Sequence, residues 1–311
     1  MTPAEQAQRG GHVTHADEWA VTEPAVIDGM PDAAYHADPV LGGSLSASGA
    51  KTLLRAPALF RHERDHGRPP KREFDLGHAA HLLTLGAGPE LEVVDAADWR
   101  TKAAKEQRDK ARAAGRVPVL GREFEAVSDM VYALRQHPIA SELLDPSTMR
   151  PEVSVFWRDP WHPSVMRRAR LDAISRPDED GGHIVVDYKT CNAADPDSIS
   201  RAMWTYGYAL QAAWYLEAAS AAASPQRPIA CDRFLFVFQE KTPPYLVTVV
   251  EPSPDALRVG EKQTREAVDL YAGCVESGRW PGYVSDDEIP LIGLPAWVER
   301  RFAIEEEEVI W

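Results

Sequence analysis

Cysteine is scarce in this sequence of 311 residues, which contains three: Cys191, Cys231 and Cys274. They are odd in number and roughly 40 residues apart, so they cannot form a disulfide framework or a closely spaced metal-binding pair. An iron–sulfur cluster held by cysteines alone needs four thiolates, and the count excludes it as well.

The sequence also lacks long hydrophobic runs, and it contains fewer basic than acidic residues. No stretch approaches the roughly 18 uninterrupted apolar residues of a membrane-spanning helix. Residues 1–19 contain no apolar signal-peptide core, so we expect a cytoplasmic location. Lys and Arg total 34 against 48 Asp and Glu, a net charge of −14. This balance argues against a protein that simply coats nucleic acid, but it is compatible with local contacts to DNA.

The rest of the composition is typical of a soluble globular protein, with 44% hydrophobic and 26% charged residues. Residues 1–30 are polar and lack periodicity, which predicts a loosely ordered leader. Residues 31–285 are predicted to form one domain, with a mostly helical part over about 44–150 and a sheet core over about 151–280. The residues from 286 to 311 are predicted to form an acidic tail.

The sheet core is predicted from a change in hydrophobic period. Three segments rich in Val, Ile and aromatic residues, separated by turn signals, predict successive antiparallel strands over 152–158, 165–175 and 183–190. A long helix over about 197–222, two further strands and a helix over 254–277 follow. This order predicts an α/β (α+β) fold, a central mixed sheet flanked by helices.

Two of these strands carry the residues with the most informative chemistry. Asp187 and Lys189 alternate on one strand, so they point to the same face, roughly 6.5–7 Å apart. Asp172 lies on the preceding strand and would sit beside Asp187 if the two strands are neighbours. Two carboxylates repel each other unless a cation or a shared proton relieves them, and Mg²⁺ or Mn²⁺ prefers such oxygen ligands. The alternative is a salt bridge between Asp187 and Lys189 at a buried edge.

The flanking residues favour a functional site. Tyr208, Gln211 and Tyr215 share one face of the following helix, where an aromatic stripe usually means core packing. A glutamine within that stripe needs polar partners, which a site with water, phosphate or a carboxylate would provide. Glu152 opens the first strand and could reach the same cleft.

Two histidines, His78 and His81, lie on one predicted helix face together with Leu82 and Leu85. Core packing is the default interpretation for both. Their spacing differs from that of the zinc-binding motif with two histidines, and no thiol cluster accompanies them, so structural zinc is disfavoured. One of them could add an imidazole ligand to an ion bound by Asp172 and Asp187.

In their order and spacing, these motifs together resemble the PD-(D/E)XK nuclease superfamily, and within it the RecE-type (exonuclease VIII-like) exonucleases of phages and prophages. The similarity covers about residues 40–285 and rests on short motifs: Leu45-Ser46-Ala47-Ser48, Gly77 to Leu83, Trp99 to Gly115, Glu152, Arg170-Leu171-Asp172, Asp187-Tyr188-Lys189-Thr190, Gly207 to Tyr215, and Gly278 to Tyr283. Asp187 stands where many members of the superfamily have Glu, a change that RecE-type proteins tolerate. The related CRISPR-adaptation nucleases carry four cysteines, so that branch is disfavoured.

The resemblance implies a role for each matching residue. Asp172 and Asp187 would bind the metal ion, Mg²⁺ or alternatively Mn²⁺, with the backbone carbonyl of Tyr188 and the imidazole of His81 as further ligands. Lys189 would be the catalytic lysine. Glu152 would support the metal site or contact the water network. Gln211 and Tyr215 would position the scissile strand or the lysine.

The activity implied is degradation of linear double-stranded DNA from a 5′ end, leaving a 3′ single strand for an annealing (RecT-like) partner. Relatives form rings, so the resemblance also implies a homo-oligomer. Two alternatives stay open: a non-catalytic protein that binds DNA ends during recombination, and an endonuclease of the same superfamily.

Local basic segments reconcile the net charge with a DNA substrate. Residues 51–72 contain seven Lys and Arg against two acids, and residues 100–116 contain another seven against two. Such segments are often ordinary solvated surface, but together they could line a channel that binds phosphates. The candidate DNA contacts are Lys51, Arg55, Lys102, Lys105, Arg167, Arg168 and Arg170.

Overall fold

The computed structural model of this chain describes residues 19–67, 72–175, 182–222, 230–284 and 287–302. The strands are β1 Ala25–Ile27, β2 Leu45–Ser46, β3 Leu91–Val94, β4 Val117–Leu120, β5 Met149–Arg158, β6 Met166–Ser175, β7 Gly182–Cys191, β8 Ala230–Glu240 and β9 Val247–Val250. The helices are α3 Asp32–His36, α4 Ala47–Arg55, α5 Pro57–His66, α6 Arg72–Leu85, α7 Lys102–Ala113, α8 Gly121–Gln136, α9 Pro138–Leu143, α10 Pro196–Thr205, α11 Tyr208–Ala222, α12 Pro254–Ser277 and α13 Ala296–Phe302.

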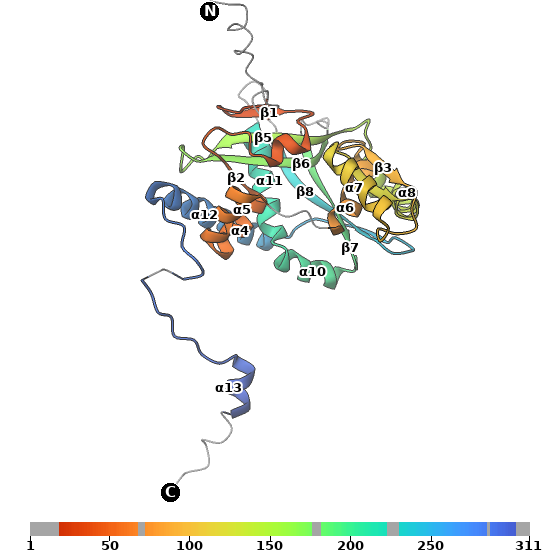
Figure 1. Cartoon of the computed structure of the whole chain (residues 1–311). Helices are drawn as coiled ribbons and strands as arrows, with labels where there is room; N and C mark the ends of the chain where they lie inside the picture. Colours follow the sequence, from red (N-terminus) through yellow and green to blue (C-terminus); the bar gives the residue numbers. More distant parts are fainter. Residues whose placement is uncertain (1–18, 68–71, 176–181, 223–229, 285–286, 303–311) are drawn as a thin grey trace, which may run out of the picture.

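A mixed sheet occupies the centre of the molecule (Figure 1). Its strand order is β1-β5-β6-β7-β8-β9, and β2 pairs with β6. The strands β5, β6 and β7 are antiparallel neighbours, as their turn signals predict, whereas β7 and β8 run parallel. The parallel pair needs a crossover, and α10 and α11 provide it. The predicted fold class, a mixed sheet flanked by helices, is confirmed.

Each face of the sheet is covered by its own core. On one face Val185, Phe234 and Phe236 pack with residues of α4, α11 and α12, including the fully buried Trp214. On the other face Val186 and Tyr188 pack with residues of α6, α8 and β4. The alternation of Val185, Val186, Asp187 and Tyr188 along β7 therefore sends successive side chains to opposite cores.

One predicted helix is divided in two. The helix expected over 197–222 breaks at Gly207, which has a φ of +61° and separates α10 from α11. The helix that begins after Ser46 ends at Arg55, and Pro57 starts α5 in a new direction. The hydroxyl of Ser46 caps α4 by accepting the backbone N–H of Gly49 at 3.1 Å.

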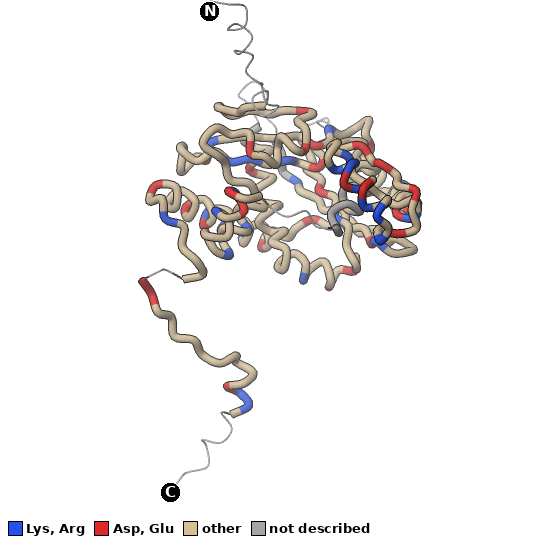
Figure 2. The backbone as a smooth tube through the Cα atoms, viewed as in Figure 1, with Lys and Arg blue, Asp and Glu red and all other residues tan. Residues whose placement is uncertain are grey.

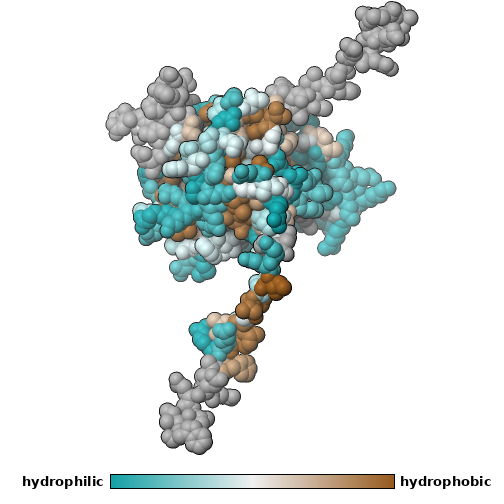
Figure 3. All heavy atoms as spheres, turned by 90° about the vertical axis from the view of Figure 1, so that its left-hand side faces the viewer, coloured by the Kyte–Doolittle hydropathy of each residue, from teal (hydrophilic) through white to brown (hydrophobic). Residues whose placement is uncertain are grey.

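The ends of the described chain differ from expectation in opposite ways. Residues 19–30, assigned by composition to a loose leader, contain β1, which pairs with β5, and the buried Met30. The segment 287–302, expected to be acidic, instead exposes large apolar side chains away from the body of the molecule (Figure 3). Residues 303–311, with the run of glutamates, lie outside the described residues.

Hydrophobicity along the helices also bears on membrane insertion. Among the described residues, no helix is both long enough and apolar enough to cross a bilayer.

Candidate active site

The candidate site forms where β6 and β7 separate. The two strands pair at Ala173↔Val186 and Ile174↔Val185, and this register places Asp172 opposite Asp187. Beyond that point β7 continues to pair with β8. The gap is bridged by a side chain, because the carboxylate of Asp172 accepts the backbone N–H of Tyr188 at 3.0 Å. The two predicted carboxylates therefore meet at the open end of the strand pair.

Asp187 is fully buried and holds two polar partners in fixed positions. One carboxylate oxygen lies 2.5 Å from the ammonium nitrogen of Lys189. The other accepts a hydrogen bond from the side-chain amide of Gln211 at 2.6 Å. The glutamine within the aromatic stripe of α11 thus has the carboxylate partner that the sequence interpretation required. Asp187 and Lys189 do form a salt bridge, but it lies beside further titratable groups.

Glu152 reaches Asp172 through an unusual backbone conformation. Its φ of +52° is rare for a residue with a side chain, and the pair Glu152–Asp172 drops out of an otherwise regular β5–β6 ladder. The carboxylate of Glu152 also forms an ion pair with Arg170. We infer that the strained backbone turns Glu152 toward the cleft.

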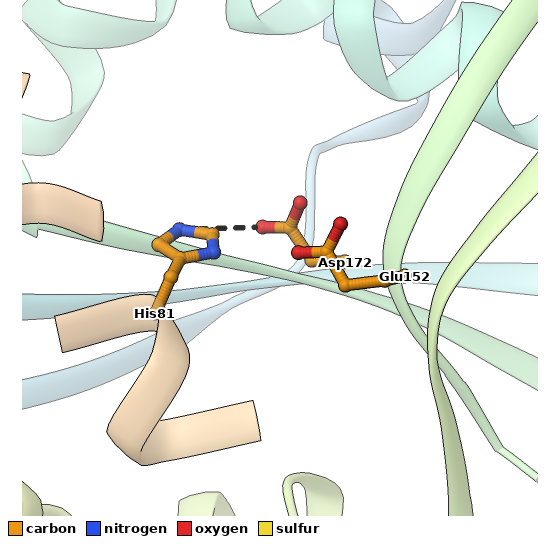
Figure 4. Close-up of side chains that lie close together, drawn as sticks. All are labelled: His81, Glu152 and Asp172. Atoms are coloured by element: carbon orange, nitrogen blue, oxygen red, sulfur yellow. Dashed lines mark ion pairs between the residues drawn. The ribbon is translucent and has the colours of Figure 1, made fainter. Parts of the chain in front are cut away.

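Three side chains from separate elements complete a set of metal-type donors (Figure 4). His81 from α6, Glu152 from β5 and Asp172 from β6 each offer a ligand atom, and these atoms all lie within 4.8 Å of one another. The Nε2 atom of His81 is 3.7 Å from Asp172 and 2.9 Å from the backbone carbonyl of Tyr188. The ring of Tyr188 points to the opposite core, where its hydroxyl donates to Gln239 at 2.7 Å. Tyr188 therefore offers its backbone carbonyl to the site, while its ring packs beside the ring of His81, with ring centres 5.2 Å apart.

The electrostatics of this cluster suit a cation. Burial, together with the charge of Asp172, raises the pKa of Asp187 to about 6. The same two causes raise the pKa of Glu152. Burial lowers the pKa of Lys189, but the carboxylates of Asp187 and Asp172 outweigh it and raise that pKa above its usual range. Crowded carboxylates with an imidazole and a carbonyl are donors that Mg²⁺ or Mn²⁺ accepts, so the residues present fit a divalent ion.

A second lysine, Lys51 of α4, belongs to the same site. Its ammonium donates to the side-chain carbonyl of Gln211 at 3.1 Å. It also lies 5.4 Å from the centre of the Tyr208 ring, and Lys189 lies 5.7 Å from the same ring. Burial, followed by the charge of Lys189, lowers the pKa of Lys51 to about 7. The sequence indicates Lys51 as a candidate DNA contact within a basic segment. It does not place Lys51 beside Gln211, because that proximity depends on how α4 packs on α11.

Tyr215 lies further along the same face of α11. Its ring packs against Phe234, with ring centres 6.1 Å apart. Burial raises the pKa of its hydroxyl well above the ordinary value, and the charges of Asp187 and Asp172 raise it further. A role for Tyr215 in positioning the scissile strand or the lysine stays a prediction. His78, the other histidine of α6, has a side chain outside those that the structure describes.

The three arginines of β6 do not line an open channel, in contrast to the expectation. Arg167 is fully buried between the Trp157 and Trp214 rings, and it pairs with Asp159 at 3.1 Å and with Glu217. Arg168 pairs with Asp38 at 2.6 Å. Arg170 pairs with Glu152, and only 10% of its side chain is exposed. These guanidinium groups are committed to carboxylates inside the fold.

The remaining basic candidates lie on the surface. Arg55 is exposed at the end of α4, and Lys102 and Lys105 are exposed on α7. Lys102 lies 3.7 Å from Glu106, and acidic residues alternate with basic ones along α7 (Figure 2). The charge of this helix is therefore partly balanced by its own carboxylates.

A mixed sheet with two carboxylates and a lysine at the point where two strands separate defines a nuclease fold of the PD-(D/E)XK type. The model of the PD-(D/E)XK nuclease superfamily matches residues 44–281, and the chain belongs to this superfamily. A crystal structure from Eubacterium rectale, of a protein provisionally assigned as an exonuclease, superposes with a TM-score of 0.52. The match has 10% identity and covers 84% of this chain and 93% of that one. No curated protein matches the chain as a relative.

Proposed function

We propose that this nuclease is a metal-dependent exonuclease of the RecE type that hydrolyses linear double-stranded DNA with Mg²⁺, or with Mn²⁺ in its place. The observation that supports the proposal most directly is the joint position of Asp172, Asp187 and Lys189. A structural salt bridge needs only one carboxylate for Lys189. The second carboxylate, Asp172, instead lies with His81 and Glu152, and the ligand atoms of these three residues are all within 4.8 Å of one another.

The donors for the ion are Asp172, Asp187, the carbonyl of Tyr188 and His81, with Glu152 beside them. A divalent ion bound there supplies a Lewis acid that polarises the phosphate and lowers the pKa of a bound water. Lys189, fixed by Asp187, orients the attacking water and offsets negative charge that develops on the phosphate. Gln211 holds Asp187 through its amide group, so the carboxylate keeps one orientation.

Polarity, partners and assembly follow from the resemblance of the motifs to RecE-type proteins. On this proposal the chain removes nucleotides from a 5′ end and leaves a 3′ single strand for an annealing protein, and it works as a homo-oligomeric ring in the cytoplasm. Contacts with the DNA backbone come from the exposed Arg55, Lys102 and Lys105 and from Lys51 inside the site.

Digestion of linear duplex labelled at the 5′ or the 3′ end tests the proposal. With Mg²⁺ we expect immediate loss of a 5′ label, slow loss of a 3′ label and an intact closed circle. Nicking of the circle would favour an endonuclease. Binding to linear ends with no nucleotide release under any divalent ion would favour a non-catalytic end-binding protein. Immediate release of the 3′ label would show that degradation starts at the 3′ end instead.

A further inference from the structure

Lys51 is placed at the active site by the packing of α4 against α11. Gly207, just before α11, has no side chain, and a Cβ atom there would lie 3.3–3.4 Å from three carbons of the Lys51 chain. The aliphatic part of Lys51 therefore fills the space beside Gly207, and its ammonium reaches the side chain of Gln211. Contacts of the aliphatic chain and of the ammonium therefore both hold Lys51 in this position.

Gln211 links the two lysines through one carboxylate. Its amide nitrogen donates to Asp187, and its carbonyl oxygen accepts from Lys51. Asp187 contacts Lys189 directly but reaches Lys51 only through this glutamine. The amide orientation is thereby determined, because reversing it would place a donor against the ammonium.

The two ammonium groups together favour an anion between them. Both face the Tyr208 ring. Burial, followed by the charge of Lys189, lowers the pKa of Lys51, and the charge of Asp187 opposes this only in part. Two like charges in a partly buried site repel each other unless an opposite charge arrives. The N-terminus of α11, which follows Gly207, adds the positive end of a helix dipole to the same region. A phosphate oxygen would relieve this repulsion.

We propose that Lys51 is a second active-site lysine that binds a non-bridging oxygen of the scissile phosphodiester, on the side away from the carboxylates that would hold the metal ion. This inference rests on the proposed nuclease function and names a contact within it. Lys51 forms no covalent bond and transfers no proton; its charge stabilises the oxygen as the water attacks. An ammonium hydrogen bond to an anionic oxygen is of the strong, charge-assisted kind.

The first test compares cleavage by Lys51→Met with cleavage by Lys262→Met. Methionine keeps an unbranched chain beside Gly207 but removes the ammonium, and Lys262 is an exposed lysine of α12. We expect Lys51→Met to slow single-turnover cleavage of linear duplex about 10²-fold, and Lys262→Met to match wild type. Equal melting temperatures of the two variants would show that the loss is not due to unfolding.

The second test locates the contact without cleavage. Duplexes carry a stereopure methylphosphonate at the terminal linkage, so that one non-bridging oxygen is replaced by a neutral methyl group, and binding is measured with Ca²⁺ in place of Mg²⁺. For wild type, we expect the isomer that lacks the oxygen facing Lys51 to bind roughly 10-fold more weakly than unmodified DNA. Lys51→Met should bind this isomer and unmodified DNA equally, while its response to the other isomer stays as in wild type.

The outcomes distinguish a failure of the proposed Lys51 contact from a failure of the proposed nuclease function. If wild type cleaves DNA but Lys51→Met cleaves as fast as Lys262→Met, the inference fails and the nuclease function stands. If Lys51→Met keeps the wild-type response to both isomers, Lys51 does not contact the scissile phosphate. A wild-type chain that cleaves no DNA with any divalent ion overturns the proposed function, and this inference with it.

Discussion

Two neighbouring strands, β6 and β7, both carry charged residues into the interior, and they use them differently. On β6, the guanidinium groups of Arg167, Arg168 and Arg170 each meet a carboxylate from elsewhere in the fold. On β7, Asp187 is placed opposite a second carboxylate, Asp172, and beside two lysines. The arginines of β6 are balanced by carboxylates within the protein, whereas Asp187 of β7 shares its site with a second carboxylate, Asp172 of β6, which favours a bound cation.

The difference shows that basic character by itself does not mark a DNA contact. Arg167 is one of three arginines on its strand, yet it forms ion pairs with Asp159 and Glu217 inside the fold. Lys51 looks like one surface lysine among several in the sequence, yet it hydrogen-bonds a residue that holds the central carboxylate. The partners of a charged group, rather than its presence, separate structural residues from functional ones.

The largest effect on cleavage is expected from a substitution of Lys189 on β7. Replacing Lys189 by Met removes the ammonium that orients the water, so we expect single-turnover cleavage to fall about 10²–10⁴-fold. DNA binding measured with Ca²⁺ should change far less. A variant that cleaves at the wild-type rate would show that Lys189, like the arginines of β6, has only a structural role.

The second effect concerns stability and belongs to β6. Arg167→Met leaves Asp159 and Glu217 without this buried partner, and we expect a loss of roughly 3–5 kcal/mol in the free energy of unfolding. Denaturant titration measures the loss. At a temperature where the variant is folded, its cleavage rate should match wild type. Weakened DNA binding with unchanged stability would instead make Arg167 a DNA contact.

A third, smaller effect is a pH dependence of stability that comes from Lys51. Its pKa falls from the ordinary 10.5 to about 7 on folding, so the unfolded chain binds more protons between these values. The free energy of unfolding should therefore rise with pH across this window, by at most about 1.4 kcal/mol per pH unit. Denaturant titrations at pH 7 and pH 9 should show a smaller rise for Lys51→Met than for wild type. An equal rise in the free energy of unfolding for wild type and Lys51→Met would contradict the lowered pKa of Lys51.

The smallest effect is expected at the exposed lysines of α7. Replacing Lys102 and Lys105 by Gln should weaken DNA binding with Ca²⁺ modestly and lower the slope of log K against log salt by about 1–2. Cleavage at saturating enzyme should not change. An unaltered salt slope would show that α7 is ordinary solvated surface.

Local patterns were sufficient to predict the centre of the fold and part of the site. The strands β5, β6 and β7 are signalled by β-branched and aromatic residues between turns, and the fold class follows from their order. Asp187 and Lys189 share a face because side chains alternate along a strand. Neighbouring antiparallel strands then bring Asp172 opposite Asp187.

Contacts between distant segments could not be predicted in the same way. The arginines of β6 looked available because Asp38, Asp159 and Glu217 lie far from them in sequence or on other elements. The strand β1 is too short to carry a period of its own, and it forms because β5 offers an edge. Lys51 reaches the site through the packing of α4 against α11, with its aliphatic chain beside Gly207.

Asp187 is the central residue of the proposed mechanism, because it contacts Lys189 directly and is linked to Lys51 through Gln211. The most direct measurement is the rate of nucleotide release from linear duplex DNA with Mg²⁺, for wild type and Asp187→Ala, with and without a chelator. We predict release by wild type alone, and none once the ion is removed. Release by Asp187→Ala at the wild-type rate, or release that continues in the chelator, would contradict the account.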